Sequence, residues 1–331
     1  MICCVARFLE MTEDFAEKNM EAKADIYLKE NVFPSISNSL MVLHRCESLL
    51  PMSEEINLVS RLINAIANNA CKEQLASGLL KLDHSYQTNS TPKTESDLIS
   101  DWWSKSLVLS IDFLHRVLSA VKTKGLKQDI LSKILINYTQ HALENLEGGD
   151  AQMIMEFQKK RRVVVEAVVN LLPSQSKKNH VPISFLSTLL KNSLASSASP
   201  SCRSELERRI GLQLDQAILE DILIPSNSQR NNSPMYDTES ISRIFSIFLN
   251  INEDEEDENN SMVYNFDSPT SPNQSSIIKV SKLLDNYLTE VAVDPSLHPS
   301  KFISLAELLP DHARLVSDCL YRAVDIFLKV N

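Results

Sequence analysis

The stretch Glu307–Asn331, ELLPDHARLVSDCLYRAVDIFLKVN, carries the pattern that decides the fold class. Apolar side chains recur at a spacing that places them on one side of a helix, while charged side chains take the other side. The apolar set is Leu315, Val316, Cys319, Leu320, Ala323, Val324 and Phe327. This 3.6-residue period predicts an amphipathic helix with one buried face.

The same period recurs along most of the chain. The segment 107–122 repeats it with Val108, Ile111, Leu114, His115, Leu118 and Val121. The other helical segments are 54–71, 126–146, 151–172, 215–224, 240–250 and 277–293. No segment alternates as a half-buried strand does, and only 5 glycines occur in 331 residues, too few for many tight hairpins. The sequence therefore predicts an all-α fold, a multi-helix bundle or array with long disordered loops.

Composition argues against several classes of function. The 5 glycines cannot form a glycine-rich phosphate loop, and the net charge of −10 disfavours a nucleic-acid partner. The 6 cysteines are scattered without a C-x-x-C pair, which favours free, buried thiols in a reducing compartment. The histidines, including His115 and His141, lack metal-site spacing. We expect no cofactor, no metal and no membrane-spanning segment.

Polar stretches divide the chain into five predicted segments. Residues 1–85 form an N-terminal helical block, 86–100 a linker and 101–225 a central helical block. Residues 226–276 are mostly flexible, acidic and serine-rich with one helix near 238–250, and 277–331 are C-terminal helices. Within this scheme Asn252–Ser276 is expected to be disordered because it is acidic and poor in apolar residues. Ser193–Ser201 is interpreted as a linker.

Three helical runs end at the same Leu-Leu-Pro sequence, at Pro51, Pro173 and Pro310. Proline ends the incoming helix and suits the first turn of the next one. We therefore predict a recurring joint between helices. The separations of the three prolines are too long and too unequal for a solenoid repeat.

Asp311, His312 and Arg314 lie within one turn, which raises the question of catalysis. Asp311 suits the start of a helix, and Arg314 can form a modest surface pair with it. A hydrolase would need a nucleophile near His312, but Ser317 faces elsewhere. Helix initiation is the favoured interpretation, and no enzyme activity is expected. A hydrolase would predict that His312→Ala abolishes turnover.

Other candidate sites concern regulation and packing. Ser233, Ser268 and Ser271 each precede a proline and are candidate phosphorylation sites, and Tyr321 fits a loose tyrosine-kinase pattern or flanks a buried stripe. KKRR at Lys159–Arg162 is interpreted as a solvated helix face, with a nuclear signal as the alternative. Asp101 is expected to cap a helix that Trp102 and Trp103 anchor in the core.

Five blocks in this order resemble one plant family, the non-phototropic hypocotyl / root phototropism family. The blocks are Arg7–Phe33, Cys46–Ala67, Asp101–Lys127, Gly211–Pro225 and Leu308–Val330. Within them the family-signature residues are Asp101, Trp102, Trp103, Leu309, Pro310, Asp311, His312, Ala313 and Arg314. The resemblance implies a helical domain that follows a BTB/POZ domain and is not catalytic.

The resemblance also implies a function. Family members are substrate adaptors of cullin-3 RING ubiquitin ligases in phototropism and auxin signalling, with protein clients such as receptor kinases. The alternative is a membrane-associated photoreceptor scaffold without a ubiquitin role. We expect a cytoplasmic protein, with peripheral contact at the plasma membrane. We also expect the chain to be truncated at both ends relative to the family, so that it lacks the BTB domain that binds cullin-3.

Overall fold

The computed structural model describes the chain in segments. They are residues 2–9, 11, 19–83, 108–145, 154–173, 181–226, 234–258, 272–309, 313–314 and 318–330. These segments contain helices and no strand, apart from an isolated antiparallel bridge between Pro225 and Tyr236. The predicted all-α class is confirmed.

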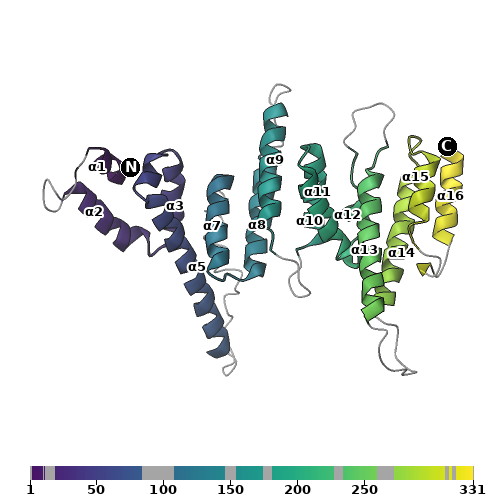
Figure 1. Ribbon diagram of the computed structural model, residues 1–331, viewed down its shortest axis with the longest axis horizontal. Coiled ribbons are helices and arrows are strands. Elements are labelled where there is room, and N and C mark those ends of the chain that lie inside the picture. Colours follow the sequence, from purple (N-terminus) through teal and green to yellow (C-terminus); the bar gives the residue numbers. More distant parts are fainter. Residues whose placement is uncertain are drawn as a thin grey trace, which may run out of the picture. The chain divides into compact units, whose positions relative to one another are not determined.

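Contacts divide the chain into two compact units. The first comprises Met1–Gly148 and Asn170–Ser174, and the second comprises Gly149–Val169 and Gln175–Asn331. Figure 1 labels the helices of both units in chain order, from purple to yellow. The five-segment division drawn from composition stays a prediction.

The first unit contains helices that pack as sequence neighbours. They are α1 (Ile2–Phe8), α2 (Met20–Tyr27), a π-helical turn (Leu28–Val32), α3 (Ile36–Glu47), α4 (Met52–Glu55), α5 (Leu58–Asp83), α7 (Ile111–Thr123) and α8 (Gln128–Glu144). Helix α5 packs against both α3 and α7. The long α5 therefore joins the two sides of this unit.

Helix α7 shows how its sequence fixes the buried face. Its buried side chains are Phe113, Leu114, Val117, Leu118 and Val121, a stripe with helical spacing. Val108 and His115, which the sequence analysis placed on that stripe, are exposed. The buried face is therefore rotated toward Phe113 and Val117, because contacts with α5 select which part of a broad apolar arc is covered.

The second unit continues the helical pattern. It contains α9 (Ile154–Leu171) as far as Val169, α10 (Ile183–Ala195), α11 (Pro200–Gly211), a 3-10 turn (Leu214–Gln216), α12 (Leu219–Ile222), α13 (Thr238–Glu258), α14 (Pro272–Val291), α15 (Pro299–Ala306) and α16 (Asp318–Val330). Helix α11 packs between α10 and α13, and α14 packs against α15 and α16. Pro200 and Pro299 occupy first turns, where a missing N–H costs nothing.

One close approach holds α11 against α13. At Gly211, a Cβ atom would lie 2.8 Å from Cγ2 of Ile247, nearer than side-chain carbons can pack. Glycine at this position therefore lets the end of α11 touch α13.

Several expectations about individual segments are wrong. The segment 215–224 is a 3-10 turn and the one-turn α12 instead of one helix. Ser193–Ser201 is a tight joint rather than a linker, because α10 extends to Ala195 and α11 starts at Pro200. Ser193 and Ser196 are buried there, and their hydroxyls donate to the carbonyls of Leu190 and Asn192 at 2.7 Å each. Those bonds compensate the burial of polar groups.

Helices also enter the stretch expected to be disordered. Helix α13 extends to Glu258 and α14 begins at Pro272, so only 259–271 of Asn252–Ser276 lie outside the described residues. The run from Glu253 to Glu258 continues a helix whose earlier turns are fixed by burial of Ile241, Phe245 and Phe248. Tertiary packing therefore extends the helix into a sequence of low apolar content.

The cysteines have free thiols in differing environments. Cys4, Cys46 and Cys202 are buried, Cys3 and Cys71 are partly exposed, and Cys319 is exposed. The expectation of buried thiols is thus met by three of the six. Cys319 belongs to the opening stripe, in which Ala323 and Phe327 are buried and Leu320 and Val324 are partly exposed. The ring of Phe327 stacks on that of Phe302 in α15, with centroids 4.4 Å apart.

Candidate functional site

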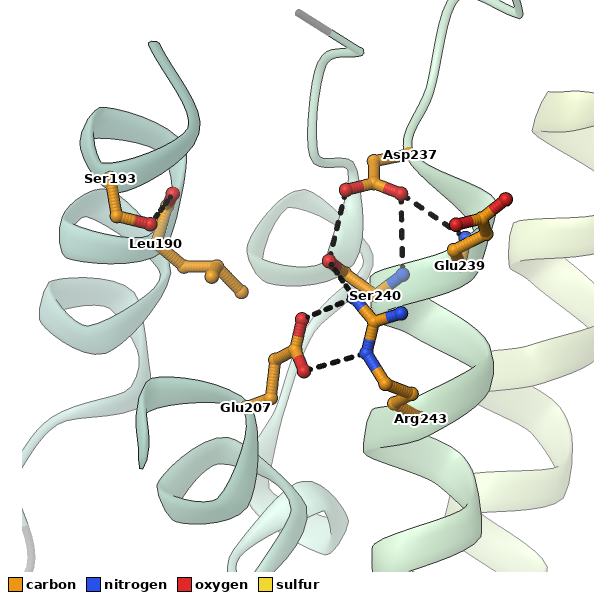
Figure 2. A network of polar contacts seen from close by, with 7 residues as sticks. All are labelled: Leu190, Ser193, Glu207, Asp237, Glu239, Ser240 and Arg243. Carbon is orange, nitrogen blue, oxygen red and sulfur yellow. Dashed lines mark hydrogen bonds and ion pairs between the residues drawn. The ribbon is translucent and has the colours of Figure 1, made fainter. Parts of the chain in front are cut away.

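The first turn of α13 is the centre of a polar network (Figure 2). Asp237 precedes the helix, and its Oδ1 accepts hydrogen bonds from the backbone N–H groups of Glu239 and Ser240, at 3.2 Å each. The hydroxyl of Ser240 donates to Oδ2 of Asp237 at 2.9 Å. A carboxylate at this position satisfies N–H groups that have no partner inside the helix and complements the helix dipole.

A bidentate ion pair ties the network to α11. Nε and Nη2 of Arg243 donate to the two carboxylate oxygens of Glu207, each at 2.8 Å, as Figure 2 shows. The side chain of Glu207 is 2 % exposed, and its carboxylate raises the pKa of Arg243. Nη2 also donates to the Ser240 hydroxyl at 3.1 Å. The start of α13 is therefore fixed to α11 through oriented, charge-assisted hydrogen bonds.

The chain that leads into α13 is held from two sides. The N–H of Asp237 donates to the carbonyl of Ile224 at 2.8 Å, and the N–H of Ser226 donates to the carbonyl of Met235 at 2.9 Å. On the other side, Oδ2 of the buried Asp294 accepts from the N–H of Met235 at 2.5 Å. These bonds give the segment a fixed backbone position beside α13.

A cleft of about 390 Å³ opens between these elements. The end of α10, the start of α11, the segment leading into α13, and α15 each contribute to its wall. Its polar and charged lining residues include Ser197, Arg203, Asp237, Thr238, Glu239 and Lys301. These charged and hydroxyl side chains suit the cleft to holding a polar ligand.

A smaller cleft of about 110 Å³ lies in the first unit. Cys3, Asp25 and Arg61 are among its lining residues. Asp25 pairs with Lys29 at 2.8 Å and with Arg61, and these partners, led by Lys29, lower the pKa of its carboxyl group. Because its charged groups already pair with one another, this cleft offers fewer free polar groups than the larger one.

The signature residues near the chain end have a packing role where the structure describes them. Leu309 and Ala313 are buried at 3 % and 2 % exposure. Nε of Arg314 donates to Oδ1 of Asp285 in α14 at 3.1 Å, and its Nη2 donates to the carbonyl of Ala306 at 2.8 Å. The side chains of Arg314 and Asp285 are 8 % and 4 % exposed, so this pair is buried. The pair of Arg314 with Asp311 that sequence spacing suggested involves a residue outside the described part of the chain and stays a prediction.

Burial and the ion pair act on Asp285 in opposite directions. Burial raises the pKa of its carboxyl group, and Arg314 offsets part of that rise. Sequence reasoning missed Asp285 because it lies 29 residues from Arg314. The sequence offered one signal of a buried pair, which is that the acidic residue Asp285 lies on the apolar face of α14.

Some of the remaining candidate site residues lie in the described part of the chain, and others lie outside it. Tyr321 is 72 % exposed on α16, and Lys159, Lys160 and Arg162 are exposed on α9, as a solvated face requires. Outside the described residues lie Ser233, Ser268, Ser271, Asp101, Trp102, Trp103, Pro310, Asp311 and His312. The candidate phosphorylation sites therefore stay predictions.

Metal clusters and membrane-spanning helices would mark other kinds of site. Among the described residues, no group of three or more His, Cys, Asp or Glu side chains is arranged to hold a metal ion. No helix in the described part of the chain has the length and apolar character needed to cross a bilayer.

The chain is similar to plant proteins along almost its whole length. A BTB/POZ domain-containing protein of Arabidopsis thaliana is 59 % identical over 348 residues, which cover 99 % of this chain and 54 % of that protein. The BTB/POZ domain-containing protein SETH6 of Arabidopsis thaliana is 58 % identical over 345 residues, covering 99 % of this chain and 53 % of SETH6. Root phototropism protein 2 of Arabidopsis thaliana is 32 % identical over 342 residues, covering 99 % and 53 %.

The chain thus spans about half the length of the curated relatives it matches. No solved structure matches it. Residues 101–331 match the NPH3 family, which is more than half of the chain. The order of the five sequence blocks, the helical architecture and this match agree, and the chain belongs to the NPH3 family.

Proposed function

We propose that this chain is the helical part of a non-catalytic substrate adaptor for a cullin-3 RING ubiquitin ligase. Membership of the NPH3 family, with relatives named for a BTB/POZ domain, carries the proposal. The family resemblance implies that the BTB/POZ domain makes the cullin-3 contact and that the helical domain presents clients. The chain acts by stoichiometric binding: its packed helices form a surface that holds a client protein near the ligase.

The geometry supports a binding role. The polar cleft beside α13 has walls fixed by the Glu207–Arg243 pair and by the Asp294 contact, so its shape is set before any ligand arrives. Preorganised walls reduce the ordering cost of association.

The experiment that tests the proposal joins this chain to the BTB/POZ domain of SETH6. The fusion, the chain alone and the BTB/POZ domain alone are each incubated with purified cullin-3, its RING subunit, E1, E2 and ubiquitin, and with proteins captured by the chain from plant extract. We expect the fusion to bind cullin-3 and to direct ubiquitin to captured proteins, and the chain alone to do neither. Binding of cullin-3 by the chain alone, or no ubiquitin transfer with the fusion, would contradict the proposal.

A second candidate is a photoreceptor signalling scaffold at the periphery of the plasma membrane, without a ubiquitin role. The observation in its favour is the 32 % identity to a protein named Root phototropism protein 2. Under this function, client abundance and ubiquitination would be unchanged when the protein is removed from plant cells, whereas receptor signalling would fall. Under the adaptor function, removal of the protein would lower client ubiquitination.

A further inference from the structure

The cleft beside α13 is lined by Arg203, whose guanidinium has no partner among the described residues. Nε of Arg203 is buried and makes no hydrogen bond, and no acidic side chain of the described chain lies within ion-pair distance of this residue. Arg208, on the same helix, binds Glu205 at 2.9 Å. A buried donor without an acceptor costs free energy that a bound acceptor would recover.

A second polar group on the cleft wall is also without a partner. Thr238 is 5 % exposed and lines the cleft, and its hydroxyl makes no hydrogen bond within the part of the chain that the structure describes. Ser197 lines the same cleft with an exposed side chain, at the turn that joins α10 to α11. Arginine and two hydroxyl groups around one space form a donor set suited to an anionic oxygen.

The acidic groups of the cleft already have partners. Asp237 accepts from the N–H groups of Glu239 and Ser240 and from the Ser240 hydroxyl. Glu239, whose side chain is 68 % exposed, pairs with Lys301 at 3.1 Å. Lys301 is therefore paired with Glu239, and Arg203 is the cation of the described cleft wall that has no carboxylate partner.

We propose that this cleft binds a carboxylate or phosphate group carried by a peptide segment of a partner protein. Arg203 binds the anion through its guanidinium, and Thr238 and Ser197 donate from their hydroxyls. The volume of about 390 Å³ exceeds that of one anion and falls in the range of sites that take a ligand of several groups. Calling that partner a client rests on the proposed adaptor function, whereas the binding itself does not.

The test follows the Arg203 side chain directly, with the purified 331-residue chain and no ligase component. Protein labelled with ¹⁵N-arginine is titrated with inorganic phosphate and with three short Gly/Ser peptides that differ only at the centre: phosphoserine, glutamate or glutamine. The Nε–H resonance of Arg203 is assigned by its loss in Arg203→Lys. We expect saturable shifts of this resonance with phosphate, and with the phosphoserine peptide, the glutamate peptide or both.

Two variants make the result specific. Arg203→Gln should weaken binding of the anionic peptides by about tenfold or more, because a charge-assisted hydrogen bond is lost. Arg208→Gln removes the same charge from the same helix outside the cleft, and should leave affinity within about twofold. Circular dichroism shows whether both variants keep the helical content of the wild type.

The outcomes distinguish phosphorylated from acidic partner segments, and they decide whether the proposal holds. Binding of the phosphoserine peptide alone assigns the cleft to phosphorylated partners, and equal binding of the glutamate peptide assigns it to acidic segments generally. Shifts that do not saturate, equal binding of the glutamine peptide, or unchanged affinity in Arg203→Gln would overturn the proposal. Loss of ligase function in the fusion experiment would leave this result unaffected.

Discussion

Removal of the Arg314 side chain provides a direct test of the buried pair near the chain end. Arg314 and Asp285 have side chains 8 % and 4 % exposed, with Nε and Oδ1 3.1 Å apart. Arg314→Ala leaves a buried carboxylate without its cation and the Ala306 carbonyl without its donor. Breaking a buried pair in this way costs about 3–5 kcal/mol of unfolding free energy. Urea unfolding followed by circular dichroism at pH 7 measures it.

The pH dependence of this loss has a definite sign. Burial already raises the pKa of Asp285, and removal of Arg314 takes away the group that offsets the rise. The folded variant then holds a proton that the unfolded chain releases near its ordinary pKa of about 4. Because the folded state binds more protons above that pH, its stability falls as pH rises through the folded pKa. The deficit relative to wild type should be largest at pH 7 and shrink toward pH 4.

Two further proteins complete the test. Lys329→Ala removes one partner of an exposed pair with Asp325, and should change stability by no more than about 0.5 kcal/mol. Replacing both buried partners, with Asp285→Leu and Arg314→Met, should recover most of the stability lost in Arg314→Ala, because no unpaired charge remains. A deficit below about 1 kcal/mol at pH 7, or one that stays constant from pH 4 to pH 7, would refute the reasoning.

Three other predictions concern packing and surface charge. Gly211→Ala should destabilise the chain by about 1–3 kcal/mol, because the added Cβ would lie 2.8 Å from Ile247; unchanged thermal unfolding would contradict this. Leu118→Ala, at a fully buried position, should cost about 2–5 kcal/mol in urea unfolding, and a loss below that range would show a loosely packed first unit. The hydrogen bond from the N–H of Ser199 is the main cause that lowers the pKa of Glu166 in the folded protein. This bond therefore contributes its full stabilisation at pH values above the pKa of Glu166 in the unfolded chain, and the stabilisation is lost as pH falls through the pKa of Glu166 in the folded protein. Glu166→Gln should therefore be less stable than wild type at pH 7 and equal to it in acid; a constant difference would exclude the linkage.

The fold class could be predicted from local pattern because helix periodicity is a property of neighbouring residues. The stripes at α7 and α16 predicted helices that the structure contains, and the helix expected near 238–250 is α13. The extent of burial within each stripe was not predictable. Ala323 is buried whereas Cys319 is exposed on the same predicted face, since contact with other helices covers only part of the arc.

The candidate site was largely hidden from sequence reasoning. Glu207 and Arg243 lie 36 residues apart and read as ordinary helix-surface charges, yet they form the bidentate pair that fixes α13. Arg203 carried no motif, and its lack of a partner is visible only when its surroundings are known. Spacing rules identify pairs three or four residues apart within one helix, but they cannot identify pairs between helices.

The sequence by itself determined that this chain is all-helical, which residues can face a core, and which family its ordered blocks resemble. The tertiary structure decided which charges pair, where α13 begins against α11, and that a polar cleft with an unpaired arginine lies beside it. The physical reason is that helix formation depends on side-chain spacing along one turn. Ion pairs and clefts depend instead on distances between helices, and packing alone sets those distances.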